Sequence, residues 1–308
     1  MRVSLVDPSR TVLKIVGGLL EARNHEVRAF TDGQEAFEYT KSDTQVGAFI
    51  TSAELASMSG LKLCSQIRTL SDGGRPLYVI LMSSNQDRHK LIDALDNGAD
   101  DFIGKPPHVE ELYARLRAAE RVVSMQRELC RLASTDPLTG VLNRRAFFER
   151  AEEACARAEA GARLSAIMLD IDHFKHVNDV YGHDVGDEVI RGVARATTGE
   201  TAIVGRLGGE EFAILLERRS LADALGRAEC LRLKFAELKF ETEKGPMMLT
   251  CSLGVSEWQS DDTIGSLLKR ADVALYKAKK DGRNRALAFD TGFSSKDYIG
   301  LNSVVRSR

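Results

Sequence analysis

The sequence of 308 residues contains little of what marks several large classes of protein. It has only 6 prolines against 25 glycines, aromatic residues make up 6% of it, and it has one tryptophan. No apolar run approaches the roughly 18 residues that a transmembrane helix needs. The five cysteines are odd in number, widely spaced and without a CxxC pair, which indicates reduced thiols. These absences exclude collagen-like, low-complexity, disulfide-rich and membrane-spanning chains.

The charge balance excludes a further class. The chain has 43 basic and 45 acidic residues, whereas a domain that coats itself with nucleic acid needs a surplus of Lys and Arg. At roughly 150 residues per domain, the length suggests about two domains. The segment Met1–Asp7 has the pattern of a strand and not of a secretory signal. We therefore expect a cytoplasmic protein of two domains that binds neither nucleic acid nor a membrane.

The first half of the chain alternates between apolar runs and amphipathic helical segments. The apolar runs predict strands at residues 3–6, 27–30, 48–51, 77–82 and 101–103. Strands separated by helices imply a parallel sheet that is covered on both faces. The ligand site of such a sheet lies at the carboxyl ends of its strands. Those ends carry Asp7, Ser52, Ser83 and Lys105.

This half resembles the receiver domain of bacterial two-component response regulators over about residues 1–121. The matching motifs are Val6-Asp7-Pro8-Ser9-Arg10, residues 52–60, Ser83-Ser84 and residues 98–106. The resemblance implies a flavodoxin-like (βα)5 fold. It also implies a pocket with two acidic residues for Mg²⁺, an Asp that accepts a phosphoryl group, a Ser or Thr, and a Lys.

Two positions of that receiver pocket are altered. Asp7 keeps the first acid, but Pro8 replaces the second, and Ser52 stands at the phosphoacceptor position. Ser83 and Lys105 are retained. A serine cannot form the acyl phosphate, and the loss of a carboxylate weakens a Mg²⁺ site. We therefore predict a pseudo-receiver that is not phosphorylated and that answers to an unknown upstream regulator, if to any.

Two simpler roles stay open for the acidic groups of this pocket. Glu54 lies two residues beyond Ser52 and could fill part of the acidic site. Asp7 and Lys105 could form no more than a structural ion pair, which we regard as the simpler interpretation.

Residues 109–134 contain no glycine or proline, which predicts one long helix. One apolar stripe comprises Leu112, Leu116, Ala119 and Val123, and a second, with 3-4-3 spacing, comprises Val122, Met125, Leu129 and Leu132. We expect the second stripe, in a helical linker over residues 122–134, to form a short coiled coil. This predicts a homodimer through the receiver and the linker. The alternative is a single amphipathic helix that lies on its own domain.

Helix starts are predicted at two places after this linker. Asp136-Pro137 would put an acid at the N-cap and proline at the first helical position, and Asn143 would cap residues 144–160. A further helix is expected over residues 264–280. The chain from about Asp290 to residue 308 is polar and predicts a loose tail.

A predicted hairpin in the second half carries two glycines followed by two carboxylates. An apolar run over 202–207 is followed by Gly208-Gly209-Glu210-Glu211 and by a second apolar run over 212–216. The two glycines leave backbone N–H groups accessible to phosphates. A dense apolar strand ends in Asp170, and if it lies beside the hairpin, three carboxylates converge. With a nucleotide's phosphates, they would make an ordinary Mg²⁺ environment.

Other polar residues of this half suit a nucleotide. Lys279 and Arg283 lie four residues apart at a helix end, where they could bind the outer phosphates. Asn178 and Asp187 could recognise a purine edge. A carboxylate that accepts hydrogen bonds from a ring N–H and an exocyclic amino group prefers guanine, because adenine lacks that adjacent pair of donors.

In this order and spacing, the motifs resemble the GGDEF domain of the diguanylate cyclase family over about residues 135–289. They are Thr135-Asp136-Pro137-Leu138-Thr139-Gly140, Leu142-Asn143-Arg144, residues 170–175, Asn178-Asp179, residues 182–187, residues 206–212 and residues 276–284. The resemblance implies an α+β, palm-like nucleotidyl-cyclase fold. It implies condensation of two GTP into cyclic di-GMP and two pyrophosphates, with Mg²⁺ or Mn²⁺, by a dimer, since each domain holds one GTP.

The resemblance also assigns roles by position. It makes Asp170, Glu211 and the backbone carbonyl of Ile171 metal ligands, and Glu210 the essential acid, as a base or as a metal ligand. It gives guanine recognition to Asn178 and Asp187. It gives phosphate contacts to Gly208, Gly209, Lys175, Lys279 and Arg283.

The sequence departs from the family at one regulatory motif. Family members under product control carry RxxD ahead of the hairpin, where this chain has Gly199 and Ala202 at the Arg and Asp positions. We therefore predict weak or no feedback by cyclic di-GMP at that site. The alternative function is a catalytically silent module that binds GTP or a partner. A receiver-type transcription factor is excluded, because no helix-turn-helix follows the receiver and the second half is not basic.

Overall fold

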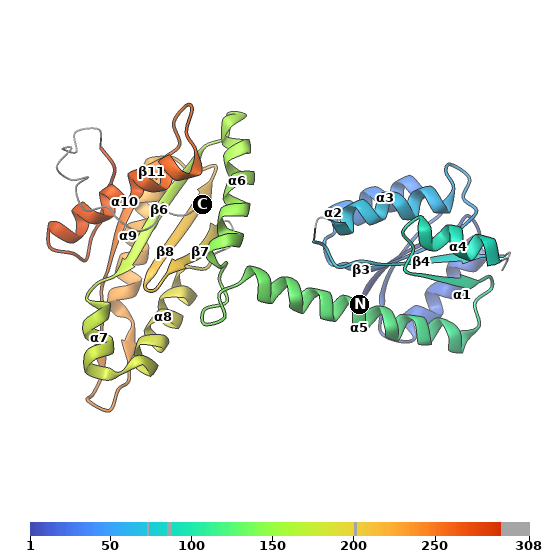
Figure 1. The fold of residues 1–308 in the computed structure, drawn as a ribbon, viewed down its shortest axis with the longest axis horizontal. Coiled ribbons are helices and arrows are strands. Elements are labelled where there is room, and N and C mark those ends of the chain that lie inside the picture. Colours follow the sequence, from blue (N-terminus) through green and yellow to red (C-terminus); the bar gives the residue numbers. More distant parts are fainter. Residues whose placement is uncertain (73, 85–87, 200–201, 291–308) are drawn as a thin grey trace. The chain divides into compact units, whose positions relative to one another are not determined.

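The computed structural model describes residues 1–72, 74–84, 88–199 and 202–290. The chain divides into two compact units, one of residues 1–131 and one from residue 132 onward (Figure 1). The expected polar tail lies, beyond Asp290, outside the described residues. Within the described ranges, no helix has both the length and the apolar character needed to cross a membrane.

The first unit is a parallel five-stranded sheet with helices on both faces. Its strands, in the order β2-β1-β3-β4-β5, are β1 (Arg2–Val6), β2 (Glu26–Phe30), β3 (Val46–Ser52), β4 (Tyr78–Ser83) and β5 (Asp101–Gly104). Its helices are α1 (Arg10–Glu21), α2 (Gly33–Ser42), α3 (Gly60–Asp72), α4 (Arg88–Asp96) and α5 (Val109–Ser134). This strand order is that of the flavodoxin-like fold, so the predicted receiver architecture is confirmed.

Helix α5 has the bounds that the sequence predicted, and its two apolar stripes have different surroundings. The stripe through Leu112, Leu116, Ala119 and Val123 is buried against the sheet of the first unit. The second stripe stays exposed in the single chain, at 38% for Val122, 67% for Met125, 64% for Leu129 and 57% for Leu132. Packing on its own unit therefore explains only the first stripe.

The second unit is built on a mixed five-stranded sheet in the order β12-β11-β6-β8-β7. Its strands are β6 (Leu164–Ile171), β7 (Ala202–Gly208), β8 (Glu211–Glu217), β11 (Cys251–Glu257) and β12 (Ala286–Ala288), and a separate ribbon joins β9 (Lys239–Phe240) to β10 (Met247–Met248). Its helices are α6 (Arg144–Glu159), α7 (Phe174–Tyr181), α8 (His183–Thr197), α9 (Leu221–Glu237) and α10 (Ile264–Lys280). The predicted hairpin and α+β class are confirmed.

The central strand β6 separates two hydrophobic cores. Ile167, Leu169 and Ile171 pack with α8 and α9, whereas Ala166 and Met168 pack with α6 and α10. Side chains alternate between the faces of a strand, so Asp170 follows Met168 onto the face that α10 covers. The same alternation that fills the two cores therefore aims the carboxylate of Asp170 at α10.

One predicted helix start is wrong. The carboxylate of Asp136 accepts hydrogen bonds from Thr139 N (3.0 Å) and Thr139 Oγ1 (2.6 Å), as an N-cap would, but the chain makes only one turn. It leaves that turn at Gly140, whose φ is +75°. Leu142 then forms a bridge to β7. Pairing with the sheet edge therefore replaces the helix that the local residues would allow.

Helix α10 packs against β11 at Gly254. A Cβ atom at this position would collide with the carbonyl oxygen of Ala271 and the backbone nitrogen of Leu275. Gly254→Ala must therefore displace α10, and we expect it to lower the free energy of unfolding of the second unit by about 2–3 kcal/mol. Urea denaturation followed by the fluorescence of Trp258, the sole tryptophan, measures this unit.

The matched control is Gly226→Ala in α9, where a Cβ atom meets nothing within 4 Å. We expect this change to stabilise the unit by up to about 1 kcal/mol, because alanine favours a helix interior over glycine. Equal effects of the two substitutions would contradict the close approach of α10 to β11.

Candidate active site

The candidate site begins with two carboxylates on neighbouring strands. Asp170, near the end of β6, lies directly opposite Glu211, the first residue of β8. Residues that face each other across an antiparallel pair share one face of the sheet. Asp170 is 6% exposed, and Glu211 is half-buried. The predicted convergence of the strand end with the hairpin is therefore present.

A lysine from α10 is paired with the first of these carboxylates. Lys279 Nζ lies 2.7 Å from Asp170 Oδ2. Burial raises the pKa of Asp170 to about 6; the ammonium of Lys279 opposes this shift, and the nearby charges of Glu210 and Glu211 add to it. Burial likewise raises the pKa of Glu211. The site therefore holds more negative charge than its lysine neutralises.

Asp272 is a further acidic residue of this cluster, which the sequence analysis missed. Burial raises its pKa to about 6, against the opposing charge of Lys279, and the charge of Asp170 raises it further. The charge of Asp272 is also the main electrostatic cause, after burial, of the raised pKa of Glu211. Its spacing from Lys279 is seven residues, which places both on one face of α10. That spacing was the available signal.

The turn between β7 and β8 is open above its two glycines. A Cβ atom at Gly208 or Gly209 would meet nothing within 4 Å, and Gly209 has φ of +40°. The side chain of Arg206 links this turn to Asp136 by hydrogen bonds. Its Nε donates to the carbonyl of Gly209 (2.8 Å), and its Nη1 donates to Asp136 Oδ1 (3.0 Å). The segment around Asp136 thus fixes the turn that the resemblance gives to phosphate.

The two residues predicted to recognise guanine lie at the junction of α7 and α8. Asn178 Oδ1 occupies the space that a side chain at Gly186 would need, and Asp187 is the next residue along α8. Both polar side chains are half-buried. Within the described ranges, neither Asn178 nor Asp187 forms a side-chain hydrogen bond or ion pair, so both are available to a ligand.

The remaining predicted residues lie at the margins of the cluster. Lys175 is exposed on α7. Arg283 lies beyond the end of α10, with φ of +63°, and its N–H donates to the carbonyl of Ala278 (2.9 Å). The buried carboxylate of Asp172 fixes this turn, since it accepts a hydrogen bond from Asn284 N (3.0 Å). Among the described residues, neither cation is paired with a carboxylate of the site.

The donor set suits a hard divalent cation, although the carboxylates do not form a complete metal site by themselves. In the part of the chain that the structure describes, no three acidic, histidine or cysteine side chains gather closely enough to hold a metal ion. Asp170 and Glu211 supply oxygens on one face, with negative charge left to neutralise. Ile171 follows Asp170 and buries its side chain in the opposite core.

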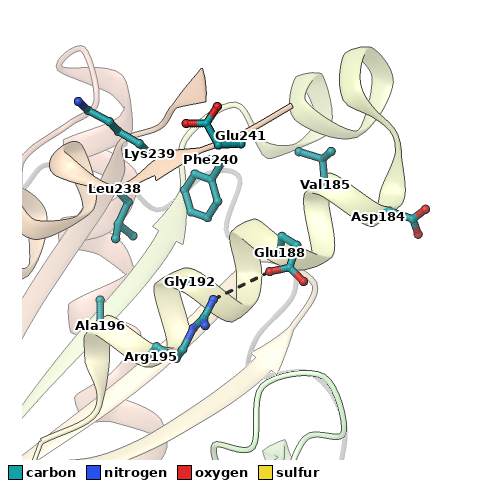
Figure 2. A pocket seen from close by; sticks show the side chains of 10 residues that line it. All are labelled: Asp184, Val185, Glu188, Gly192, Arg195, Ala196, Leu238, Lys239, Phe240 and Glu241. Atoms are coloured by element: carbon teal, nitrogen blue, oxygen red, sulfur yellow. Dashed lines mark ion pairs between the residues drawn. The ribbon is translucent and has the colours of Figure 1, made fainter. Parts of the chain in front are cut away.

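A separate hollow of about 680 Å³ lies beside α8 (Figure 2). It runs between one face of α8 and residues 238–241, with Phe240 standing over Gly192. Glu188 and Arg195, 3.9 Å apart, face each other along its wall. None of the residues predicted for the active site lines it.

The side chains predicted for the receiver pocket of the first unit contact one another. Lys105 Nζ lies 2.5 Å from Asp7 Oδ2 and donates to Ser52 Oγ (2.6 Å). Asp7 is fully buried, and Ser83 is buried as well. The carboxylate of Glu54 accepts a hydrogen bond from the Oγ of the exposed Ser84 (3.3 Å). Asp7 and Lys105 form the expected ion pair.

Two family models match the chain. The model described as "Diguanylate cyclase, GGDEF domain" matches residues 133–285, and that described as "Response regulator receiver domain" matches residues 3–117. Among solved structures, the coiled coil and GGDEF domain of DgcB from Caulobacter crescentus, in complex with c-di-GMP, has a TM-score of 0.53 and 34% identity. That similarity covers 57% of this chain and 98% of the other.

Curated relatives match across both units. Response regulator PleD of Caulobacter vibrioides is 36% identical over 253 residues, which are 78% of this chain and 56% of that protein. Diguanylate cyclase DgcM of Escherichia coli (strain K12) is 35% identical over 237 residues, 74% of this chain and 54% of that protein. The chain therefore spans about half the length of these relatives.

The raised pKa of Asp272 predicts that its charge destabilises the second unit. Its pKa is about 6 in the folded protein and 3.8 when unperturbed, so the native state binds the proton more tightly. The ionised carboxylate therefore lowers the free energy of unfolding above pH 6, and this destabilisation disappears as the pH falls towards 4. Without divalent metal, we expect Asp272→Asn to stabilise the unit by on the order of 2 kcal/mol at pH 8 and not at pH 4. Urea denaturation followed by Trp258 fluorescence measures this.

The control is Asp179→Asn, at an exposed position of α7. We expect it to change stability by less than about 0.5 kcal/mol at either pH. If Asp272→Asn lowers the free energy of unfolding at pH 8, the charge of this carboxylate is stabilised by its neighbours, and the prediction is wrong.

Proposed function

Because this chain belongs to the GGDEF family of diguanylate cyclases, with a response-regulator receiver domain ahead of the GGDEF domain, we propose that it condenses two GTP into cyclic di-GMP and two pyrophosphates. The observation that carries the proposal is the Asp170–Glu211 pair, which lies beside an open two-glycine turn. Lys279 from α10 reaches the same place. Carboxylates, open backbone N–H groups and a cation together suit a nucleoside triphosphate and its metal.

We propose that Asn178 and Asp187 select guanine. The Asp187 carboxylate can accept from the N1–H and the 2-amino group, and the Asn178 amide can both donate and accept. Adenine offers no such adjacent donors, so it would leave these half-buried groups unpaired, which is costly. The support is that both side chains are free of protein partners among the described residues and that Gly186 brings Asn178 next to α8.

We propose that Asp170, the carbonyl of Ile171 and Glu211 hold Mg²⁺ or Mn²⁺, which would neutralise the triphosphate and make the attacking 3′-hydroxyl more acidic. Glu210 would serve as the essential acid, as a base or as a further ligand. The N–H groups of Gly208 and Gly209 would contact phosphate. The cations Lys175, Lys279 and Arg283 would bind the outer phosphates.

The active form that we propose is a homodimer, because each domain holds one GTP and two must face each other. The exposed stripe of α5 offers a self-complementary surface. The end of α5 is also tied to the active-site hairpin. Asn143 N donates to the carbonyl of Ser134 (2.9 Å), and Leu142 N donates to the carbonyl of Val204 in β7 (3.1 Å). A change at α5 therefore has a short hydrogen-bonded route to the turn that would bind phosphate.

The receiver is proposed to act without phosphorylation, in a cytoplasmic protein. Ser52 has no carboxylate to phosphorylate, and Lys105 already neutralises Asp7. We also propose that product feedback at the RxxD position is weak or absent, since Gly199 and Ala202 offer neither cation nor carboxylate. An upstream regulator, if there is one, would then bind the receiver rather than phosphorylate it.

The first test is turnover of GTP by the full chain with Mg²⁺ and no phosphodonor, with cyclic di-GMP followed by mass spectrometry. We expect product, at a rate that acetyl phosphate leaves unchanged. Bound GTP without product would favour the alternative of a silent GTP-binding or partner-binding module. Stimulation by acetyl phosphate would contradict the unphosphorylated receiver.

Replacement of the acid in the turn tests the catalytic assignment. Glu210→Gln keeps the shape of the side chain and removes its charge, and we expect turnover to fall about 100-fold or more. GTP binding, measured by calorimetry, should persist. Glu243→Gln, at an exposed loop position, should leave turnover unchanged. Unreduced turnover in Glu210→Gln would remove this residue from the mechanism.

Charges placed on the exposed stripe of α5 test the dimer. We expect Met125→Lys combined with Leu129→Lys to shift the chain to monomers in sedimentation and to lower the specific activity about tenfold in dilute enzyme. The activity should recover as the protein concentration rises. Gln126→Lys, at an exposed polar position of the same helix, should change neither. A fully active monomer would refute the proposed dimer.

A further inference from the structure

A small hollow of about 180 Å³ lies in the first unit, away from the receiver pocket. It is lined by Arg23, His25, Tyr113, Leu116, Arg117 and Glu120. Since one water takes roughly 30 Å³, the hollow has room for about six waters or a small ion and is too small for a nucleotide. Its lining comes from two places only, the turn that follows α1 and one face of α5.

The turn after α1 presents a cation and a buried imidazole. Asn24 has φ of +59°, and His25 N returns to the carbonyl of Leu20 (3.2 Å). The guanidinium of Arg23 lies over the ring of Tyr113, 4.3 Å from its centre. His25 is only 8% exposed, yet its Nδ1 has no hydrogen-bond partner among the described residues. A buried polar atom without a partner is costly, and it therefore points to a ligand.

Helix α5 supplies the other wall. Tyr113, Leu116, Arg117 and Glu120 have the i, i+3, i+4, i+7 spacing of one helix face. Arg117 is exposed, and within the described ranges it has no ion-pair partner. Glu120 faces the imidazole, with Oε1 3.7 Å from His25 Nδ1. Two guanidinium groups thus stand against one carboxylate, and the hollow has a net positive charge.

We propose that this hollow binds a small oxyanion, of the phosphate or dicarboxylate type. The guanidinium groups of Arg23 and Arg117 would donate hydrogen bonds to its oxygens. A guanidinium is planar and carries several donors, which suits the geometry of an oxyanion. His25 Nδ1, which faces Glu120 at 3.7 Å without forming a hydrogen bond, would form the remaining hydrogen bond to the oxyanion. Burial lowers the pKa of His25, and the charge of the N-terminal amine lowers it further, whereas the charge of Glu120 and a backbone hydrogen bond with Met1 oppose the shift. A bound anion would act in the same direction as Glu120. Leu116 closes the apolar side of the hollow.

The position of the hollow gives it a regulatory consequence. Four of its six lining residues belong to α5, which runs on to Ser134, and the receiver is proposed to act without phosphorylation because Ser52 offers no carboxylate. Occupancy would therefore change the packing of α5 on its own unit. That this affects cyclic di-GMP synthesis rests on the proposed function, whereas anion binding does not.

Nuclear magnetic resonance of the histidine C–H groups in the full-length protein tests the binding directly. His25→Gln identifies the His25 signal. Inorganic phosphate and malonate are titrated separately at constant pH and ionic strength, against sodium chloride. We expect the His25 signal to shift saturably with one or both probes and not with chloride. The probe that saturates, or the tighter of the two, identifies the class of oxyanion.

Two variants localise the effect. Arg23→Gln and Arg117→Gln should each weaken the binding about tenfold, which is the value of one charge-assisted hydrogen bond. Arg121→Gln, also exposed on α5 but outside the hollow, should change the affinity little. A shift that is linear, that chloride reproduces, or that survives both Arg→Gln changes overturns the proposal. The cyclase rate with the saturating probe is measured separately, so failure of the proposed activity cannot be confused with failure to bind.

Discussion

The second unit holds incompletely neutralised negative charge at the end of a buried strand. Asp170 is only 6% exposed, and Glu211 lies directly opposite it, so the charge of Glu211 disfavours the ionised form of Asp170. Lys279 compensates only in part. Buried carboxylates with raised pKa values are typical of functional sites. The sheet register, the position of α10 and the open glycine turn all serve to hold these groups in place.

Each unit contains a lysine paired with a buried aspartate, but the charge is balanced in only one of them. In the first unit, Lys105 pairs with Asp7, which is fully buried, and Ser52 takes the remaining hydrogen bond, so the charges balance inside the protein. In the second unit, Lys279 is one-third exposed beside further acids and an open turn, so the charges do not balance. The balanced pair stabilises a scaffold, whereas the unbalanced pair leaves a site that a ligand can complete.

Helix α5 begins in the first unit, and its last turn, from Leu132, lies in the second. One stripe fills the core of the first unit, while its last carbonyls meet Asn143 at the start of the second. From there, Leu142 pairs with β7, and Arg206 joins Asp136 to the glycine turn. The hydrogen bonds of this segment make the position of the turn depend on the end of α5. The hollow proposed to bind an oxyanion is lined by residues in the first half of the same helix.

The sequence by itself determined the elements and supplied most of the residues proposed for the site. Periodicity gave the alternating strands and helices, the bounds of α5 and the hairpin, because these patterns depend on residues close together in the chain. The prediction that the receiver is not phosphorylated needed only the identity of Ser52. The tertiary structure decided what depends on distant segments. In the tertiary structure, Asp136 begins a turn at the sheet edge instead of a helix. Asp272 lies near the carboxylates of Asp170 and Glu211. His25 is buried beside α5. Local propensity cannot predict these outcomes, because strand register and helix docking set burial, and burial sets the charge and the partners of each group.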